Sequence, residues 1–149
     1  MIEKFMRFVG CHSKCLIAKF INFLVSSVQM GKEIQNWLDQ ANDDFDGAKF
    51  NFDGKKYYIA AFLCQQSVEK ALKALLIKKT CKFPKIHDLT RLARLCNAPQ
   101  HIIEFCAKIN PAYTATRYPD APKKYTKEEC KQIAEYCDNA LKWVKKNLS

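Results

Sequence analysis

The chain has 149 residues, enough for a single domain with one sizeable core and too few for two domains. Its hydrophobic fraction of 48% and charged fraction of 27% are ordinary for globular proteins and exclude wholesale disorder. Four glycines and five prolines are few for an all-β fold with many tight turns, so the composition favours an all-α fold.

The chain is basic, with 25 Lys and Arg residues against 15 Asp and Glu residues and a net charge of +10. A basic surface attracts phosphate groups, nucleic acid and acidic protein faces. Only four of the 25 cations are arginines, the residue that holds phosphates in a planar fork. This excess of lysine over arginine is therefore more typical of solvated, lysine-rich helix faces than of a dedicated polyanion site.

Residues 1–29 differ from the rest of the chain. They contain one acidic residue, Glu3, and four basic residues, Lys4, Arg7, Lys14 and Lys19. Residues 15–28 are largely apolar, but fourteen residues with a lysine inside are too few to span a bilayer, so we expect no membrane association. A signal peptide, an additional N-terminal helix and an artefact of start-codon choice all remain open. We take residues 30–149 as the domain, with Met30 as its natural start.

The first two helices are predicted at residues 32–52 and 57–79. The first has apolar residues at helical spacing: Trp37, Ala41, Phe45, Ala48 and Phe52. The second is rich in Ala and Leu and has a favourable pair four residues apart, Glu69 with Lys73. Gln65 lies on the apolar stripe of this helix and therefore needs a buried hydrogen-bond partner.

The second half of the chain predicts two short helices, a loop and a long last helix. Asp88 can cap a short helix from Leu89, and residues 100–109 form the next one. Residues 110–125 contain three prolines and no helical period, which indicates a loop, and loops of this length in small domains tend to be functional or mobile. Thr126 and Glu129 form a capping box that starts the last helix. The sum is an up-and-down bundle of four main helices plus a short one, and we expect a homodimer.

The eight cysteines include no C-x-x-C pair, so zinc knuckles and thioredoxin-like redox sites have no support. Cys64, Cys106 and Cys137 fall on apolar helical stripes, where a thiol behaves as a small hydrophobic side chain. Reduced, buried thiols indicate a cytoplasmic protein. No motif indicates a metal or a cofactor.

Three stretches together resemble the HEPN family of small helical domains. They are the helix FLCQQSVEKALKALL from Phe62 to Leu76, the sequence His87-Asp88-Leu89 followed by Leu92, and the loop 113–120 with Arg117-Tyr118-Pro119-Asp120. The likeness covers roughly residues 32–147, and residues 1–29 have no counterpart in it.

The resemblance implies a cytosolic helical bundle that dimerises and acts in nucleotide or RNA biology. Many members act beside a minimal nucleotidyltransferase partner in toxin–antitoxin-like pairs. Other branches are metal-independent ribonucleases that carry an arginine, four to six residues and then a histidine late in the bundle.

The loop supplies the residues best suited to bind a nucleotide. Arg117 can hold a phosphate in two hydrogen bonds, and Tyr113 and Tyr118 can stack on a base. His87, at a helix start, can add a switchable donor. The alternative is that these residues have structural roles. Arg117 would then pair with Asp120 or with an inward-facing Glu69, and the tyrosines would attach the loop to the bundle. His87 and Asp88 would cap the helix.

Arg94 and His101 are separated by six residues and match the ribonuclease pattern literally. Pro99 lies between them and disfavours helix at the preceding residue, so we expect the pair to straddle two short helices. Both residues also precede the loop, earlier than the resemblance expects. We therefore predict a binding module rather than an enzyme. The alternatives are a ribonuclease using Arg94 and His101 and a purely structural dimeric partner.

Overall fold

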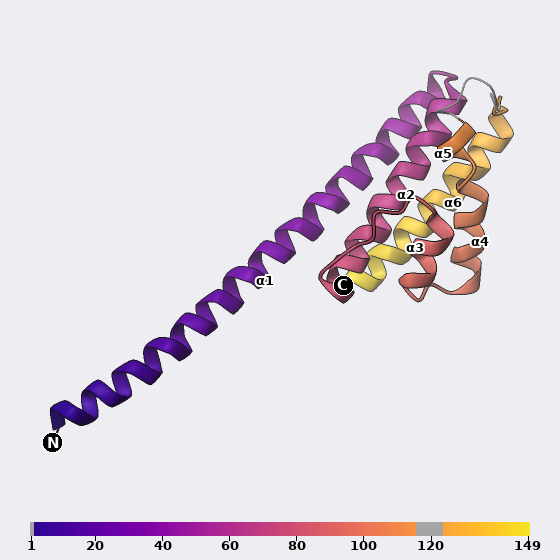
Figure 1. The fold of residues 1–149 in the computed structure, drawn as a ribbon. Helices are drawn as coiled ribbons and strands as arrows, with labels where there is room; N and C mark the ends of the chain where they lie inside the picture. Colours follow the sequence, from indigo (N-terminus) through magenta and orange to yellow (C-terminus); the bar gives the residue numbers. More distant parts are fainter. Residues whose placement is uncertain (1, 116–123) are drawn as a thin grey trace. The chain divides into compact units, whose positions relative to one another are not determined.

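The computed structural model describes residues 2–115 and 124–149, with side chains from residue 18 onward. Those residues form six helices and no strand, so the predicted all-α bundle is confirmed (Figure 1). The helices are α1 (Ile2–Asp53), α2 (Tyr57–Thr80), α3 (Leu89–Leu95), α4 (Gln100–Ile109), α5 (Ala112–Ala115) and α6 (Lys127–Leu148).

Helix α1 begins thirty residues earlier than the apolar spacing predicts, at Ile2 instead of about residue 32. No proline lies between Met1 and Asp53, so nothing in the covalent chain interrupts helical hydrogen bonding there. The chain divides into two compact units, Met1–Glu33 and Ile34–Ser149. In the part of the first unit whose side chains are described, the large hydrophobic residues exposed by 45% or more are Phe20, Ile21, Phe23, Leu24, Val25 and Val28. None of the described helices is long and apolar enough to cross a membrane.

The second unit, Ile34–Ser149, is organised around α2. This helix packs against α3, α4, α5 and α6 (Figure 1). Its side chains are buried on most sides between Ala60 and Ile77. The core is completed by Ala41 and Ala48 of α1, Leu89 and Leu92 of α3, Ile102 and Ile109 of α4, and Val144 of α6. A helix that is apolar nearly all round belongs at the centre of a bundle.

Both predicted N-terminal caps are present. The Asp88 side chain accepts hydrogen bonds from the backbone N–H groups of Thr90 and Arg91, which starts α3. The Thr126 hydroxyl accepts from the Glu129 N–H (3.1 Å), and the Glu129 carboxylate accepts from the Thr126 N–H (2.9 Å). These bonds satisfy backbone donors that the first helical turn leaves unpaired.

The stretch 110–125 is less irregular than predicted, because α5 forms one helical turn inside it. Proline suits the first turn of a helix, where its missing N–H is not needed. The carbonyl of Pro111 accepts from the N–H of Ala115 (3.1 Å) and closes that turn. The residues 116–123 lie outside the part of the chain that the structure describes.

The predicted burial of Cys64, Cys106 and Cys137 is confirmed, and all three are free thiols. Desolvation raises the pKa of Cys106 to about 12. Such a thiol stays protonated at neutral pH and acts as a small apolar side chain.

Removal of residues 1–29 is expected to change the free energy of unfolding by less than about 0.5 kcal/mol, because the described core begins at Ala41. Urea unfolding of the full chain and of the shortened chain from Met30 measures this. In the same assay, Leu72→Ala should cost about 2–5 kcal/mol, since that side chain is fully buried. A comparable loss on truncation would show that residues 1–29 stabilise the bundle.

Candidate functional site

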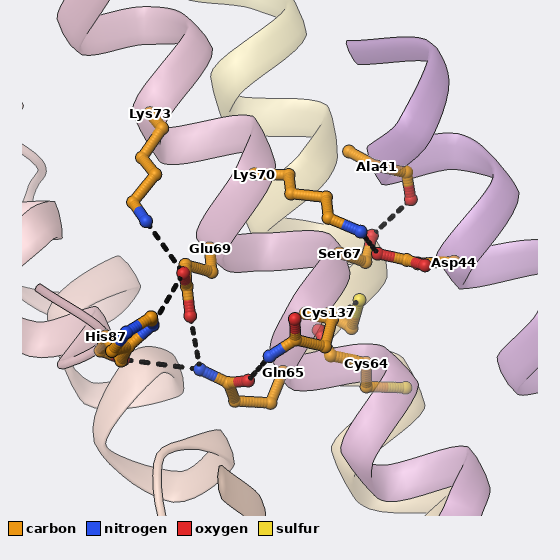
Figure 2. A network of polar contacts seen from close by, with 11 residues as sticks. Ala41, Asp44, Cys64, Gln65, Ser67, Glu69, Lys70, Lys73, His87 and Cys137 are labelled. Carbon is orange, nitrogen blue, oxygen red and sulfur yellow. Dashed lines mark hydrogen bonds and ion pairs between the residues drawn. The ribbon is translucent and has the colours of Figure 1, made fainter. Parts of the chain in front are cut away.

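Four polar side chains of α2 are buried in the otherwise apolar core: Gln65, Ser67, Glu69 and Lys73. Buried polar groups require partners, because an unpaired one costs the full penalty of desolvation. The Ser67 hydroxyl donates to the carbonyl of Ala41 in α1 (2.6 Å). The other three meet in one network (Figure 2).

Glu69 is the centre of this network (Figure 2). Its Oε1 accepts from Lys73 Nζ (2.8 Å) and lies 3.0 Å from Nδ1 of His87. Its Oε2 accepts from Gln65 Nε2 (3.1 Å). The predicted buried partner of Gln65 is therefore Glu69, and each carboxylate oxygen receives at least one donor.

The carboxyl of Glu69 is ionised. Burial alone would raise its pKa, but hydrogen bonds from Lys73, Gln65 and His87, with the charge of Lys73, outweigh burial and lower the pKa below 4.5. An ionised carboxylate only accepts hydrogen bonds, so the proton between Glu69 and His87 belongs to Nδ1. The second ring nitrogen of His87, Nε2, has no hydrogen-bond partner among the described residues.

Two further contacts fix the position of His87. Gln65 Nε2 also donates to the backbone carbonyl of His87 (3.2 Å), which ties the segment before α3 to α2. The ring of Tyr113 stacks on the imidazole, with ring centroids 4.9 Å apart and planes inclined by 16°. The side chain of His87 nevertheless remains 51% exposed. Two predicted site residues, 26 positions apart in the chain, are thus in direct contact.

A cavity of about 590 Å³ opens beside this pair of rings. Its lining residues come from the start of α3, from α4 and from α5: His87, Asp88, Thr90, Ala107, Asn110, Pro111, Tyr113 and Thr114. Asn110, at the end of α4, is hydrogen-bonded to the start of α3. Its Oδ1 accepts from the Leu89 N–H (2.9 Å), and its Nδ2 donates to Asp88 (3.1 Å).

The Asp88 carboxyl in this lining is ionised as well. The hydrogen bond from the Thr90 hydroxyl lowers its pKa, partial burial raises it, and the backbone N–H groups of Arg91 and Thr90 and the Asn110 amide lower it further. The net pKa is below 3.8. The cavity therefore contains one fixed negative charge at neutral pH.

The remaining candidates lie elsewhere. Arg117 and Tyr118, with Asp120, fall outside the described residues. Arg94 is exposed in the last turn of α3, and His101 is exposed in the first turn of α4 with its ring against Phe105. The expectation that the pair straddles two short helices is confirmed. No hydrogen bond joins the two described side chains, and neither lines the cavity.

Sequence reasoning placed Glu69 in a polar set of the long helix that could complete a nucleotide pocket or form a purely structural network, but it did not include Glu69 among the site residues. It treated Asp88 only as a cap. A signal for Glu69 was present, because it lies four residues after Gln65 and so shares its helix face. No comparable signal existed for Asn110, whose contacts with α3 depend on how α3 and α4 pack.

Solved structures with the same fold include two that are described as HEPN proteins. An archaeal HEPN homologue matches with a TM-score of 0.68 and 29% identity, over 78% of this chain and 98% of its own. A Thermus thermophilus protein matches with a TM-score of 0.70 and 25% identity, over 77% and 98%. An HEPN domain protein from Thermotoga maritima shares the fold, with a TM-score of 0.63 and 20% identity over 76% and 97%. These likenesses define a helical bundle of the HEPN type.

The family model of the HEPN domain matches residues 34–147. The chain therefore belongs to the HEPN family. No curated protein matches it.

Substitution of Glu69 tests the network through stability. Glu69→Ala should cost about 3–5 kcal/mol at pH 7, because it leaves Lys73 buried without its carboxylate. Glu69→Gln should also destabilise the protein, and the difference in free energy of unfolding between this variant and wild type should shrink as the pH falls.

The sign of the pH effect follows from the lowered pKa of Glu69. A depressed carboxyl pKa stabilises the folded state above about pH 4.5, and this stabilisation is lost as the pH falls through the folded-state pKa. Urea unfolding between pH 7 and pH 3 measures the trend, with Glu104→Gln on the exposed side of α4 as control. A deficit of Glu69→Gln that is the same at every pH would contradict an ionised, paired Glu69.

Proposed function

We propose that this HEPN-domain protein is a nucleotide- or RNA-binding module that acts with a nucleotidyltransferase partner in a toxin–antitoxin-like pair. It works as a cytoplasmic homodimer and is not itself an enzyme. The observation that carries the proposal is the imidazole of His87, which is held between the buried carboxylate of Glu69 and the ring of Tyr113 at the edge of an open cavity.

This arrangement supports ligand binding because its parts are preorganised. The hydrogen bond to Glu69 fixes the plane of the His87 ring, and the stack with Tyr113 holds its face. A rigid polar group beside an aromatic ring loses little conformational entropy when a ligand arrives. About half of the His87 side chain is still exposed, so a solute can reach it.

The sequence supplies the rest of the proposed site. Arg117 and Tyr118 follow Tyr113 by four and five residues, and a guanidinium is the side chain best suited to grip a phosphate. The net charge of +10 favours the approach of any nucleotide or RNA. The partnership with a nucleotidyltransferase rests on the family resemblance.

Titration of the full chain with ATP, AMP and a short single-stranded RNA tests the proposal. His87→Ala, Tyr113→Ala and Arg117→Ala should each weaken binding about tenfold or more, which corresponds to about 1.4 kcal/mol. His101→Ala is the matched control, since it removes an exposed histidine that does not line the cavity. Equal affinity of the His87→Ala and His101→Ala proteins would remove the proposed site.

A further inference from the structure

The cavity beside His87 differs in charge from the basic protein as a whole. Of the described side chains that line it, none is a lysine or an arginine, and the one fixed charge among them is the carboxylate of Asp88. A phosphate placed there would meet like charge, with no lysine or arginine among the described lining residues to compensate it. The basic character of the whole protein is thus absent from the described lining of this cavity.

Most donor groups in the lining are already engaged within the protein. Thr90 uses both its N–H (2.9 Å) and its hydroxyl (2.5 Å) on Oδ1 of Asp88. The amide of Asn110 donates to the same oxygen, and the Thr114 hydroxyl donates to the carbonyl of Pro111 (3.3 Å). A ligand that needs donors, as an anion does, finds these three residues occupied.

Two hydrogen-bond acceptors of the lining residues, in contrast, have no donor among the described residues. The Asp88 carboxylate takes four hydrogen bonds on Oδ1, from Thr90 twice, Arg91 and Asn110, while Oδ2 has no donor in the described part of the chain. Glu69 holds the proton of His87 on Nδ1, which makes Nε2 an acceptor in the neutral ring. The two residues that carry these acceptors, His87 and Asp88, both line the cavity.

We infer that the cavity formed by the start of α3 with α4 and α5 binds the nucleoside part of a nucleotide or RNA, by its hydroxyl and amino donors, and rejects phosphate. The inference rests on the proposed function and names which part of the ligand occupies this cavity. Asp88 contacts the nucleoside directly, and Glu69 is a positioning residue that acts through His87. The apolar groups of Ala107 and Pro111 and the ring of Tyr113 contact the base, and about 590 Å³ is ample for a nucleoside.

Titration of the full chain with adenosine, AMP and inorganic phosphate tests this assignment. Adenosine should still bind, about tenfold more weakly than AMP because it lacks the phosphate proposed to contact Arg117, and millimolar inorganic phosphate should not displace it. Asp88→Asn keeps an oxygen that can accept the capping hydrogen bonds of α3 but removes the charge, and it should weaken adenosine binding about tenfold. Asp138→Asn, which breaks a surface ion pair with Lys142 on α6, is the matched control and should have no effect.

The outcomes separate this inference from the proposed function. If ATP or RNA binds while adenosine does not, or if phosphate displaces adenosine, the cavity holds the phosphate and the inference is wrong. Equal adenosine affinity of Asp88→Asn and Asp138→Asn would also overturn it. If ATP, AMP and RNA all fail to bind, the proposed function fails, and this inference fails with it.

The positioning role of Glu69 has its own spectroscopic readout. Nitrogen-15 NMR of the histidine rings, with His87 assigned by the His87→Ala variant, should show the Nδ1–H form of the neutral ring in wild type. Glu69→Gln should shift His87 toward the Nε2–H form and weaken adenosine binding, whereas Glu104→Gln should change neither. An unchanged ring form in Glu69→Gln would show that Glu69 serves stability alone.

Discussion

The structure of this HEPN-domain protein depends on one buried carboxylate in its central helix. Glu69 is 5% exposed and lies in a helix whose other buried residues are mostly apolar. A lone charge in that environment would be expelled or neutralised by protonation. It stays ionised because Lys73, Gln65 and His87 surround it with donors (Figure 2). Every one of those partners must be in place when the bundle closes.

This requirement joins folding to the candidate site. Lys73 comes from the same helix as Glu69, and its Nζ also lies over the rings of Trp37 and Phe83, 5.7 and 5.5 Å from their centroids. His87 belongs to the segment that leads into α3 and carries the stack with Tyr113 of α5. A single carboxylate thus connects α1, α2, α3 and α5. The imidazole of His87 is held on two sides, by the hydrogen bond to Glu69 and by the stack with Tyr113.

Local features of the bundle were readable from the chain alone. The caps at Asp88 and Thr126 depend on side chains bonding to backbone groups two or three residues away, so local sequence suffices for them. The apolar spacing of α6 reports which face is buried, for the same local reason. Helix α2, for which the spacing predicts one apolar stripe, is buried on most sides because other helices pack around it. Helix α1 was placed wrongly at its start, since periodicity detects a buried face and the exposed apolar side chains from Phe20 to Val28 have none. The one-turn helix α5 was missed because four residues are too few for a period.

The amino-acid sequence by itself determined the all-helical class, the two caps, the buried thiols and the likeness to the HEPN family. It also singled out His87 and Tyr113 as chemically useful. Only the tertiary structure decided that these two rings stack, that Glu69 holds the imidazole, and that Asp88 and Asn110 border the same cavity. The reason is physical: these contacts span 18 to 26 residues of chain, and the packing of α3, α4 and α5 on α2 sets their distances.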